Sequence, residues 1–105
     1  MLTLPIKKKW FDMILSGEKK EEYRDKTPYY KARINNLWKN SPTAGLALRE
    51  IRFRNGYSVN SPSFIAKCRC KDGYGKPEWG AEPGKRYYIF EICEIVKEGD
   101  QHGED

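Results

Sequence analysis

The chain has 105 residues, of which 38% are hydrophobic and 13% aromatic, and it carries a formal net charge of +5. This length suits one compact domain and excludes two ordinary ones, while the aromatic content argues against disorder throughout. No apolar run approaches the roughly 20 residues that cross a bilayer, and the first residues lack the apolar stretch of a signal peptide. We therefore expect a monomeric cytoplasmic domain with no membrane partner.

The charge is distributed unevenly along the chain. Residues 1–54 carry a net charge of +7 and residues 55–105 one of −2. Four of the acidic residues lie in 98–105, which we expect to be an acidic, flexible tail after a single domain over residues 1–97. A basic body attracts polyanions such as nucleic acids, although a net charge of this size is also common in small domains.

The first elements are predicted to be a helix and a short strand. Ile6, Trp10 and Ile14 follow helical spacing, so a helix should begin at Pro5 and end at Gly17. Residues 18–25 are nearly all charged, and their position between two helical patterns indicates a short strand with polar sides.

A second helix is predicted over residues 28–39. Thr27 is a good N-cap, and Pro28 suits the first helical position. One side of this helix should be buried, and it carries Tyr30, Ile34, Leu37 and Trp38.

Alternating patterns predict strands over residues 46–54, 63–71 and 86–96. Asn55-Gly56 indicates a β-hairpin, and a tight two-residue turn would by itself explain this dipeptide. A glycine- and proline-rich segment, residues 73–84, should form a long loop of the kind that is often functional. Two helices and at least four strands predict an α+β fold, a small curved sheet or barrel with helices packed on it.

The cysteines give no strong indication of a metal site. Cys68, Cys70 and Cys93 would need His102, in the polar tail, to complete a tetrahedral zinc site. We favour thiols kept reduced in the cytosol and expect neither a metal nor a cofactor.

Residues 17–24 read Gly-Glu-Lys-Lys-Glu-Glu-Tyr-Arg and fit the pattern G-x-K-x-x-E-x-R. Here the chain resembles the ASCH domain family of the PUA-like superfamily, in which this motif follows the first helix. The segments 4–7, 53–57 and 74–80 extend the resemblance in the same order, so that it covers roughly residues 3–96. It implies a small PUA-like β-barrel with two N-terminal helices packed on it, a cleft beside the motif, and association with RNA.

The motif predicts the floor of a basic cleft that binds RNA or a nucleotide. Lys19 and Arg24 would neutralise phosphate, and Glu22 would orient Arg24 or accept a hydrogen bond from a base. Gly17 would allow a ligand to approach the backbone closely. A charged, exposed strand that resists edge pairing would explain the same pattern without a ligand.

The rim of this cleft should come from later segments. We expect Asn55 and Tyr57 on one side, and Trp79 beside Lys76 on the other, with the Trp79 ring stacking on a base. The alternative for Trp79 is that the loop folds its own aromatic side chains onto the barrel.

If the motif binds a ligand in this way, replacing Arg24 with Ala should weaken binding with little loss of fold.

The alternative function is a small ASCH hydrolase, either similar to N4-acetylcytidine amidohydrolases or a ribonuclease. Lys19 matches the family's lysine, but Glu22 stands where the amidohydrolases carry a threonine, so the catalytic set is incomplete. Lys19 could act as a base only if burial lowered its pKa, whereas the neighbouring Glu18, Glu21 and Glu22 would raise it. Whether the protein is an enzyme is left open by the sequence.

Overall fold

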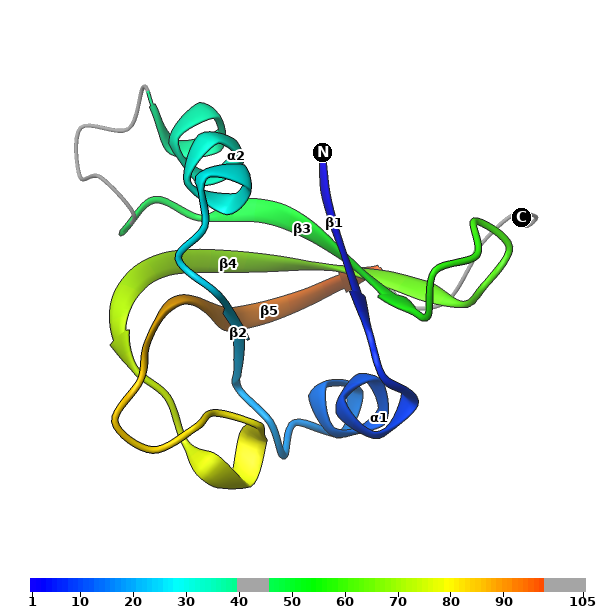
Figure 1. Cartoon of the computed structure of the whole chain (residues 1–105). Coiled ribbons are helices and arrows are strands. Elements are labelled where there is room, and N and C mark those ends of the chain that lie inside the picture. The colour runs from blue at the N-terminus through cyan, green and yellow to red at the C-terminus, as the bar shows by residue number, and fades with distance from the viewer. Residues whose placement is uncertain (40–45, 98–105) are drawn as a thin grey trace.

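The structure is a computed structural model, which describes residues 1–39 and 46–97 as two helices and one five-stranded sheet (Figure 1). In chain order the elements are β1 (Leu2–Ile6), α1 (Lys8–Ser16), β2 (Glu21–Arg24), α2 (Pro28–Trp38), β3 (Arg49–Asn55), β4 (Ser63–Tyr74), a short 3-10 helix (Pro77–Trp79) and β5 (Arg86–Lys97). The predicted α+β class is confirmed. The predicted tail and His102 lie outside the described residues.

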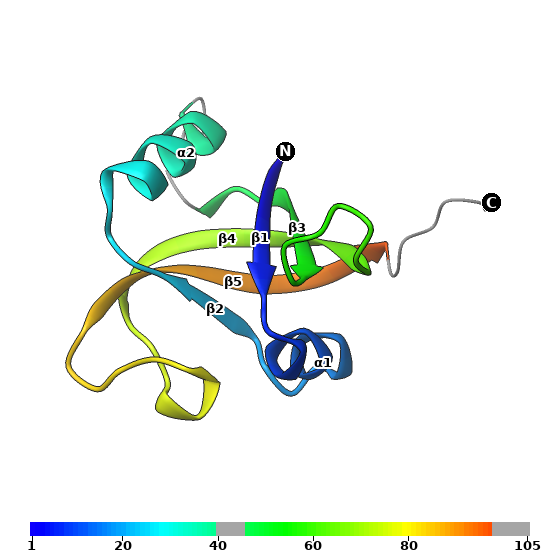
Figure 2. The same cartoon turned by 45° about the vertical axis from the view of Figure 1, so that its right-hand side comes forward.

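The sheet curls into a half-barrel in which the two edge strands face each other. Its strand order is β1-β3-β4-β5-β2, with β1 parallel to β3 and the other pairs antiparallel. The long strands β4 and β5 curve strongly, and their pairing contains two register shifts of the kind that bend a sheet. Figures 1 and 2 show β1 and β2 on the two sides of the opening, with α1 near one end and α2 near the other.

The main core lies on the inner face of this half-barrel. Ile51 and Phe53 on β3 and Phe64 on β4 are fully buried, and the Phe53 and Phe64 rings stack at 5.2 Å. From α1 and α2, Ile14 and Trp38 pack against them. Because side chains alternate along a strand, the polar residues between these positions face outward.

A second, smaller core lies on the outer face of β2 and β5. Tyr23, Tyr87 and Ile89 are buried there under Ala81, and Trp79 packs against the cluster. The loop after β4 therefore folds onto the sheet. A side chain at Gly75 has no room, since an added Cβ would lie 2.6 Å from the ring of Tyr23.

The expectation that Pro5 begins a helix is wrong. Residues 2–6 form edge strand β1, in which Leu4 and Ile6 are buried, and helix α1 starts only at Lys8. Period-two spacing of Leu2, Leu4 and Ile6 fits a strand that pairs with β3. Proline has no N–H to donate, and it is tolerated in an edge strand because one side of that strand has no neighbour to bond.

The predicted end of α1 and the predicted start of α2 are confirmed. Gly17 follows α1 in the left-handed conformation at φ 86°, and Thr27 caps α2 by accepting a hydrogen bond from the backbone N–H of Tyr30 at 3.2 Å. In α2, Ile34 and Trp38 are buried, and Tyr30 is half-buried. Neither helix among the described residues is long and apolar enough to cross a membrane.

The hairpin of β3 and β4 is confirmed, but a tight Asn-Gly turn is wrong. Arg54 pairs with Ser63, so a longer loop joins the strands. The backbone N–H of Asn55 donates to Pro62 at 2.9 Å, and that of Gly56 donates to Ile6 in β1 at 2.9 Å. The loop is thus tied to the edge strand, beside the opening of the half-barrel.

Candidate functional site

A cavity of about 640 Å³ lies between the edge strands β1 and β2. Segments that are distant in sequence meet there: the end of β1, the strand β2, the start of α2, the loop after β3 and the loop after β4. Six of its 17 lining residues are aromatic, namely Trp10, Tyr23, Tyr30, Tyr57, Trp79 and Tyr87.

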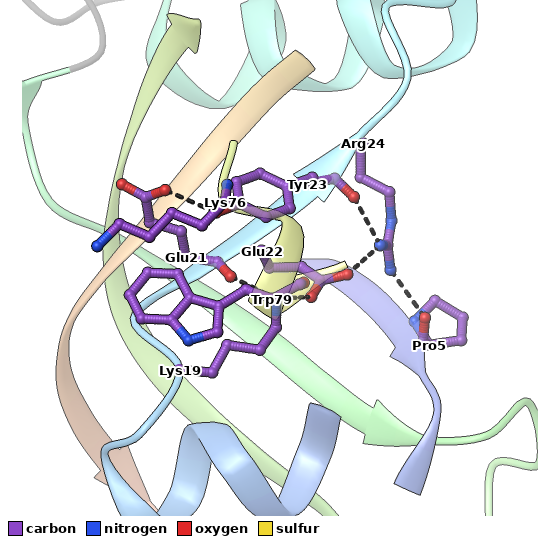
Figure 3. A network of polar contacts seen from close by, with 8 residues as sticks. All are labelled: Pro5, Lys19, Glu21, Glu22, Tyr23, Arg24, Lys76 and Trp79. Atoms are coloured by element: carbon purple, nitrogen blue, oxygen red, sulfur yellow. Dashed lines mark hydrogen bonds and ion pairs between the residues drawn. The ribbon is translucent and has the colours of Figure 1, made fainter. Parts of the chain in front are cut away.

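Three charged residues of the motif form a buried ionic network, in which Glu22 and Arg24 line the cavity and Lys19 lies outside the lining. Figure 3 shows the carboxylate of Glu22 between Lys19 and Arg24. Lys19 Nζ lies 3.2 Å from one carboxylate oxygen, and Arg24 pairs with the other. The side chains are only 1%, 7% and 15% exposed for Lys19, Glu22 and Arg24, so the alternative of an exposed charged strand is wrong.

The ammonium group of Lys19 contacts only acceptors inside the protein. Besides Glu22, its Nζ donates to the backbone oxygens of Glu21 at 2.6 Å and Trp79 at 2.7 Å, which uses all three of its N–H groups. Burial lowers the pKa of Lys19, and the carboxylate of Glu22 opposes that effect without reversing it. Lys19 does not line the cavity; with Gly17 it borders a smaller one, of about 160 Å³, at the end of α1.

Arg24 holds the two edges of the sheet together. Its guanidinium donates to Pro5 O in β1 at 2.8 Å, to Tyr23 O at 3.0 Å and to the Tyr30 hydroxyl at 3.2 Å, in addition to Glu22. Within the described residues, four of its five N–H groups are therefore satisfied, and one on Nη2 is left. The expectation that Arg24→Ala leaves the fold intact is not supported by these contacts.

Local structure explains why the motif turns inward. After α1, the backbone N–H of Gly17 donates to Ile14 O at 3.1 Å and that of Lys19 to Met13 O at 2.9 Å. The chain then enters β2, where alternation directs Glu22 and Arg24 to the inner face. Gly17 thus serves the helix end and does not contact the cavity.

The predicted rim residues Asn55 and Tyr57 do line the cavity. Among the described residues, the side-chain amide of Asn55 forms no hydrogen bond, so both its donor and its acceptor are available. Tyr57 is 87% exposed and stands at the outer edge.

On the opposite side, Trp79 lines the cavity and also packs on the outer core, so the loop does fold this ring onto the sheet, and stacking on a base stays a prediction. Lys76 does not line the cavity. Its Nζ lies 4.6 Å from the centre of the Trp79 ring, and its backbone N–H donates to the Tyr23 hydroxyl at 2.9 Å. Burial raises the pKa of Tyr23.

The charges that line the cavity are balanced. Three basic residues are matched by three acidic ones: Lys7, Arg24 and Lys85 against Glu22, Asp25 and Glu82. Lys85 pairs with Asp25 at 3.0 Å, and this contact raises the pKa of Lys85. The cavity therefore differs from the basic cleft expected from the sequence, because its cations are largely neutralised by neighbouring carboxylates.

Sequence reasoning missed most of the lining, including four residues with aromatic or charged side chains, Trp10, Tyr30, Lys85 and Tyr87. The helical spacing assigned Trp10 and Tyr30 to the core. One signal was present, because a buried tyrosine or tryptophan needs a partner for its polar group and therefore tends to lie at a boundary. In the structure, the Tyr30 hydroxyl accepts from Arg24.

The fold and the site together define a small α+β half-barrel with an aromatic, charge-balanced cavity at the seam of its sheet. A scan of family models gives no match, and searches among curated proteins and among solved structures find none either. The resemblance to ASCH domains accordingly stays a prediction that rests on the motifs of this sequence.

Proposed function

We propose that this chain is a PUA-like ASCH domain that binds RNA or a nucleotide by admitting one nucleobase to the cavity between β1 and β2. The observation that carries the proposal is the combination of flat aromatic walls with an unengaged amide, that of Asn55, in a single cavity. Stacking on aromatic rings and hydrogen bonding to base edges are the two ways in which proteins recognise unpaired bases.

The size and polarity of the cavity suit a base. Its volume of about 640 Å³ falls within the range of pockets that hold small ligands. Trp79 and Tyr57 lie on different loops that approach the mouth, so either ring offers a surface for stacking. Each base–aromatic stack contributes about 1–3 kcal/mol.

Base edges would be read by Asn55 and Arg24. The Asn55 amide offers a donor and an acceptor, and Arg24 has one N–H left on Nη2. Both oxygens of Glu22 are engaged by Lys19 and Arg24, which supports the expected role of Glu22 in orienting Arg24.

Phosphate binding by Lys19 is not part of this proposal, since its three N–H groups already have acceptors. With a charge-balanced lining, binding of an uncharged nucleoside should depend only weakly on salt, because no counterions are released.

The hydrolase alternative has one supporting observation, which is that burial lowers the pKa of Lys19. Catalysis by Lys19 would require the loop that carries Trp79 to move, since the backbone oxygen of Trp79 covers Nζ. Release of acetate from N4-acetylcytidine by the wild-type chain would support this alternative.

The test of base binding is an amide NMR titration of the labelled chain with each of the four ribonucleosides. We expect saturable shifts at Asn55, Tyr57 and Trp79 with at least one nucleoside. Asn55→Ala should weaken that binding about threefold to tenfold, the value of one neutral hydrogen bond. Asn60→Ala, in the loop that follows Asn55 but outside the cavity lining, is the matched control and should have no effect. Failure of all four nucleosides to shift the cavity residues would overturn the proposal.

A further inference from the structure

We infer that the exposed face of α2 that carries Tyr29 and Arg33 binds the backbone of a single-stranded RNA as it leaves the cavity. This inference rests on the proposed binding of a base in the cavity. It adds a cation, Arg33, that is free to contact phosphate, whereas Arg24 and Lys85 in the cavity lining are paired with carboxylates.

An uninterrupted series of contacts leads from the cavity to this face. Arg24 Nε donates to the Tyr30 hydroxyl at 3.2 Å inside the cavity. The Tyr30 ring meets that of Tyr29 edge-on, with centroids 5.0 Å apart and an interplanar angle of 87°. The guanidinium carbon of Arg33 lies 3.6 Å from the centre of the Tyr29 ring. The stacked pair Tyr29–Arg33 therefore begins directly beside the wall of the cavity.

Both side chains of the stacked pair are accessible to solvent. Tyr29 is 54% exposed, and Arg33 is exposed as well. Four residues separate them, so they share one face of the helix. A guanidinium that lies flat on a ring keeps its N–H groups at its edge, where they can donate to phosphate oxygens. Its second flat side can stack on a base, as arginine does in recognition of single-stranded RNA.

The charge of α2 contrasts with that of the cavity lining. Residues 28–39 include Lys31, Arg33 and Lys39 and no acidic residue. Within the described part of the chain, Lys31 and Arg33 form no ion pair, whereas the cavity's Lys85 is paired with Asp25. A polyanion is thus attracted to the helix, and a strand whose base enters the cavity beside Tyr30 can continue along α2, where Arg33 is not neutralised by a carboxylate.

The helix also supplies a matched control. Lys31 precedes Arg33 by two residues, which places it about 160° away around the helix. Lys31 and Arg33 carry the same charge and are both exposed, so removing either changes the net charge equally. An effect of net charge alone would be the same for both, whereas a defined path along Tyr29 and Arg33 depends on one.

The experiment measures fluorescence anisotropy of short single-stranded RNA oligomers over a series of salt concentrations. Arg33→Ala should weaken oligomer binding and reduce the slope of log affinity against log salt by about 0.7, the value of one phosphate contact on a single strand. Lys31→Ala should leave the slope unchanged. Arg33→Lys keeps the charge but not the planar stack, so it should weaken binding with little change in slope. Equal effects of Arg33→Ala and Lys31→Ala, or no effect of Arg33→Ala, would overturn the inference.

The two proposals fail in distinguishable ways. Nucleosides that bind the wild-type chain and the Arg33→Ala variant equally, together with the oligomer results above, support the path along α2. If nucleosides bind but Arg33→Ala leaves oligomer binding intact, only the inference about α2 is wrong. If no nucleoside binds, the proposed function itself is wrong, and the path that depends on it falls with it.

Discussion

Replacing Glu22 with Gln tests whether the motif network is a buried ionic structure. The substitution keeps the shape of the side chain and removes the only negative charge between Lys19 and Arg24. Both cations then lack their shared partner in a region where the Lys19 side chain is 1% exposed. We therefore expect a large loss of folding stability rather than a local adjustment.

The geometry sets the size of this loss. At the 3.2 Å separation of Lys19 Nζ and Glu22 Oε1, and at an effective dielectric constant of about 20, the Coulomb attraction is about 5 kcal/mol. Removing one partner of a buried pair typically costs about 3–5 kcal/mol, so the free energy of unfolding should fall by about that amount. Lys19 can limit the loss by giving up its proton, which Arg24 cannot do.

This release of a proton gives the variant a characteristic dependence on pH. Burial already lowers the pKa of Lys19 below its ordinary value of 10.5, and without Glu22 the folded-state pKa falls further. The unfolded state then binds more protons than the folded state, so the stability of the variant rises with pH relative to the wild type. The loss of unfolding free energy should accordingly be larger near about pH 6 than near about pH 9.

Urea denaturation followed by tryptophan fluorescence at both pH values measures these differences. Asp12→Asn is the control, because it removes the carboxylate of an exposed pair, Lys8–Asp12, whose side chains are 76% and 54% exposed. That variant should lose less than about 1 kcal/mol. A Glu22→Gln variant that behaves like Asp12→Asn, with no dependence on pH, would refute the buried network.

Three further predictions concern the core. In the folded protein an alkylating reagent should modify the exposed Cys93 first, because burial raises the pKa of Cys70 to about 11 and that of Cys68 still higher. Mass spectrometry should count three labels per chain only in denaturant. Burial also raises the pKa of Tyr23, so at high pH the folded state retains a proton that the unfolded state loses, and the free energy of unfolding should fall above about pH 10. Urea titrations should show a smaller fall for Tyr23→Phe. The same dependence of the unfolding free energy on pH in that variant would contradict this. Gly75→Ala should destabilise the fold by about 1–3 kcal/mol, because its Cβ would lie 2.6 Å from the ring of Tyr23, and an unchanged thermal melt would contradict this.

The parts of the fold that the sequence predicted well depend on local chemistry. The cap at Thr27 and the left-handed glycine at Gly17 act within one helical turn, so a few residues suffice to identify them. Strand β1 was missed because Ile6 fits both a helical and an alternating pattern. What decides between them is parallel pairing with β3, whose residues lie nearly half the chain away.

In the site, too, the residues could be predicted from local motifs, but their arrangement could not. Glu22, Arg24, Asn55, Tyr57 and Trp79 were predicted from motifs and do line one cavity. Their assembly depends on the curl of the sheet, which no single motif encodes.

The role of Lys19 could not be read from its spacing. A lysine between a helix and a strand points to solvent unless something covers it, and here the cover is the backbone of Trp79, sixty residues further on. Charge balance was equally hidden, since Lys85 and Asp25 pair only in three dimensions.

The charged residues in β2 and just before it connect this segment to separate walls of the cavity. Lys19 fixes the loop through Trp79 O, and Arg24 fixes strand β1 through Pro5 O. Glu22 holds both cations in place, so the shape of the cavity depends on one short strand. Substitutions in this network change the fold and the cavity together and cannot by themselves identify a binding function. The decisive variants are therefore those at positions such as Asn55, which contribute to the cavity and support nothing behind it.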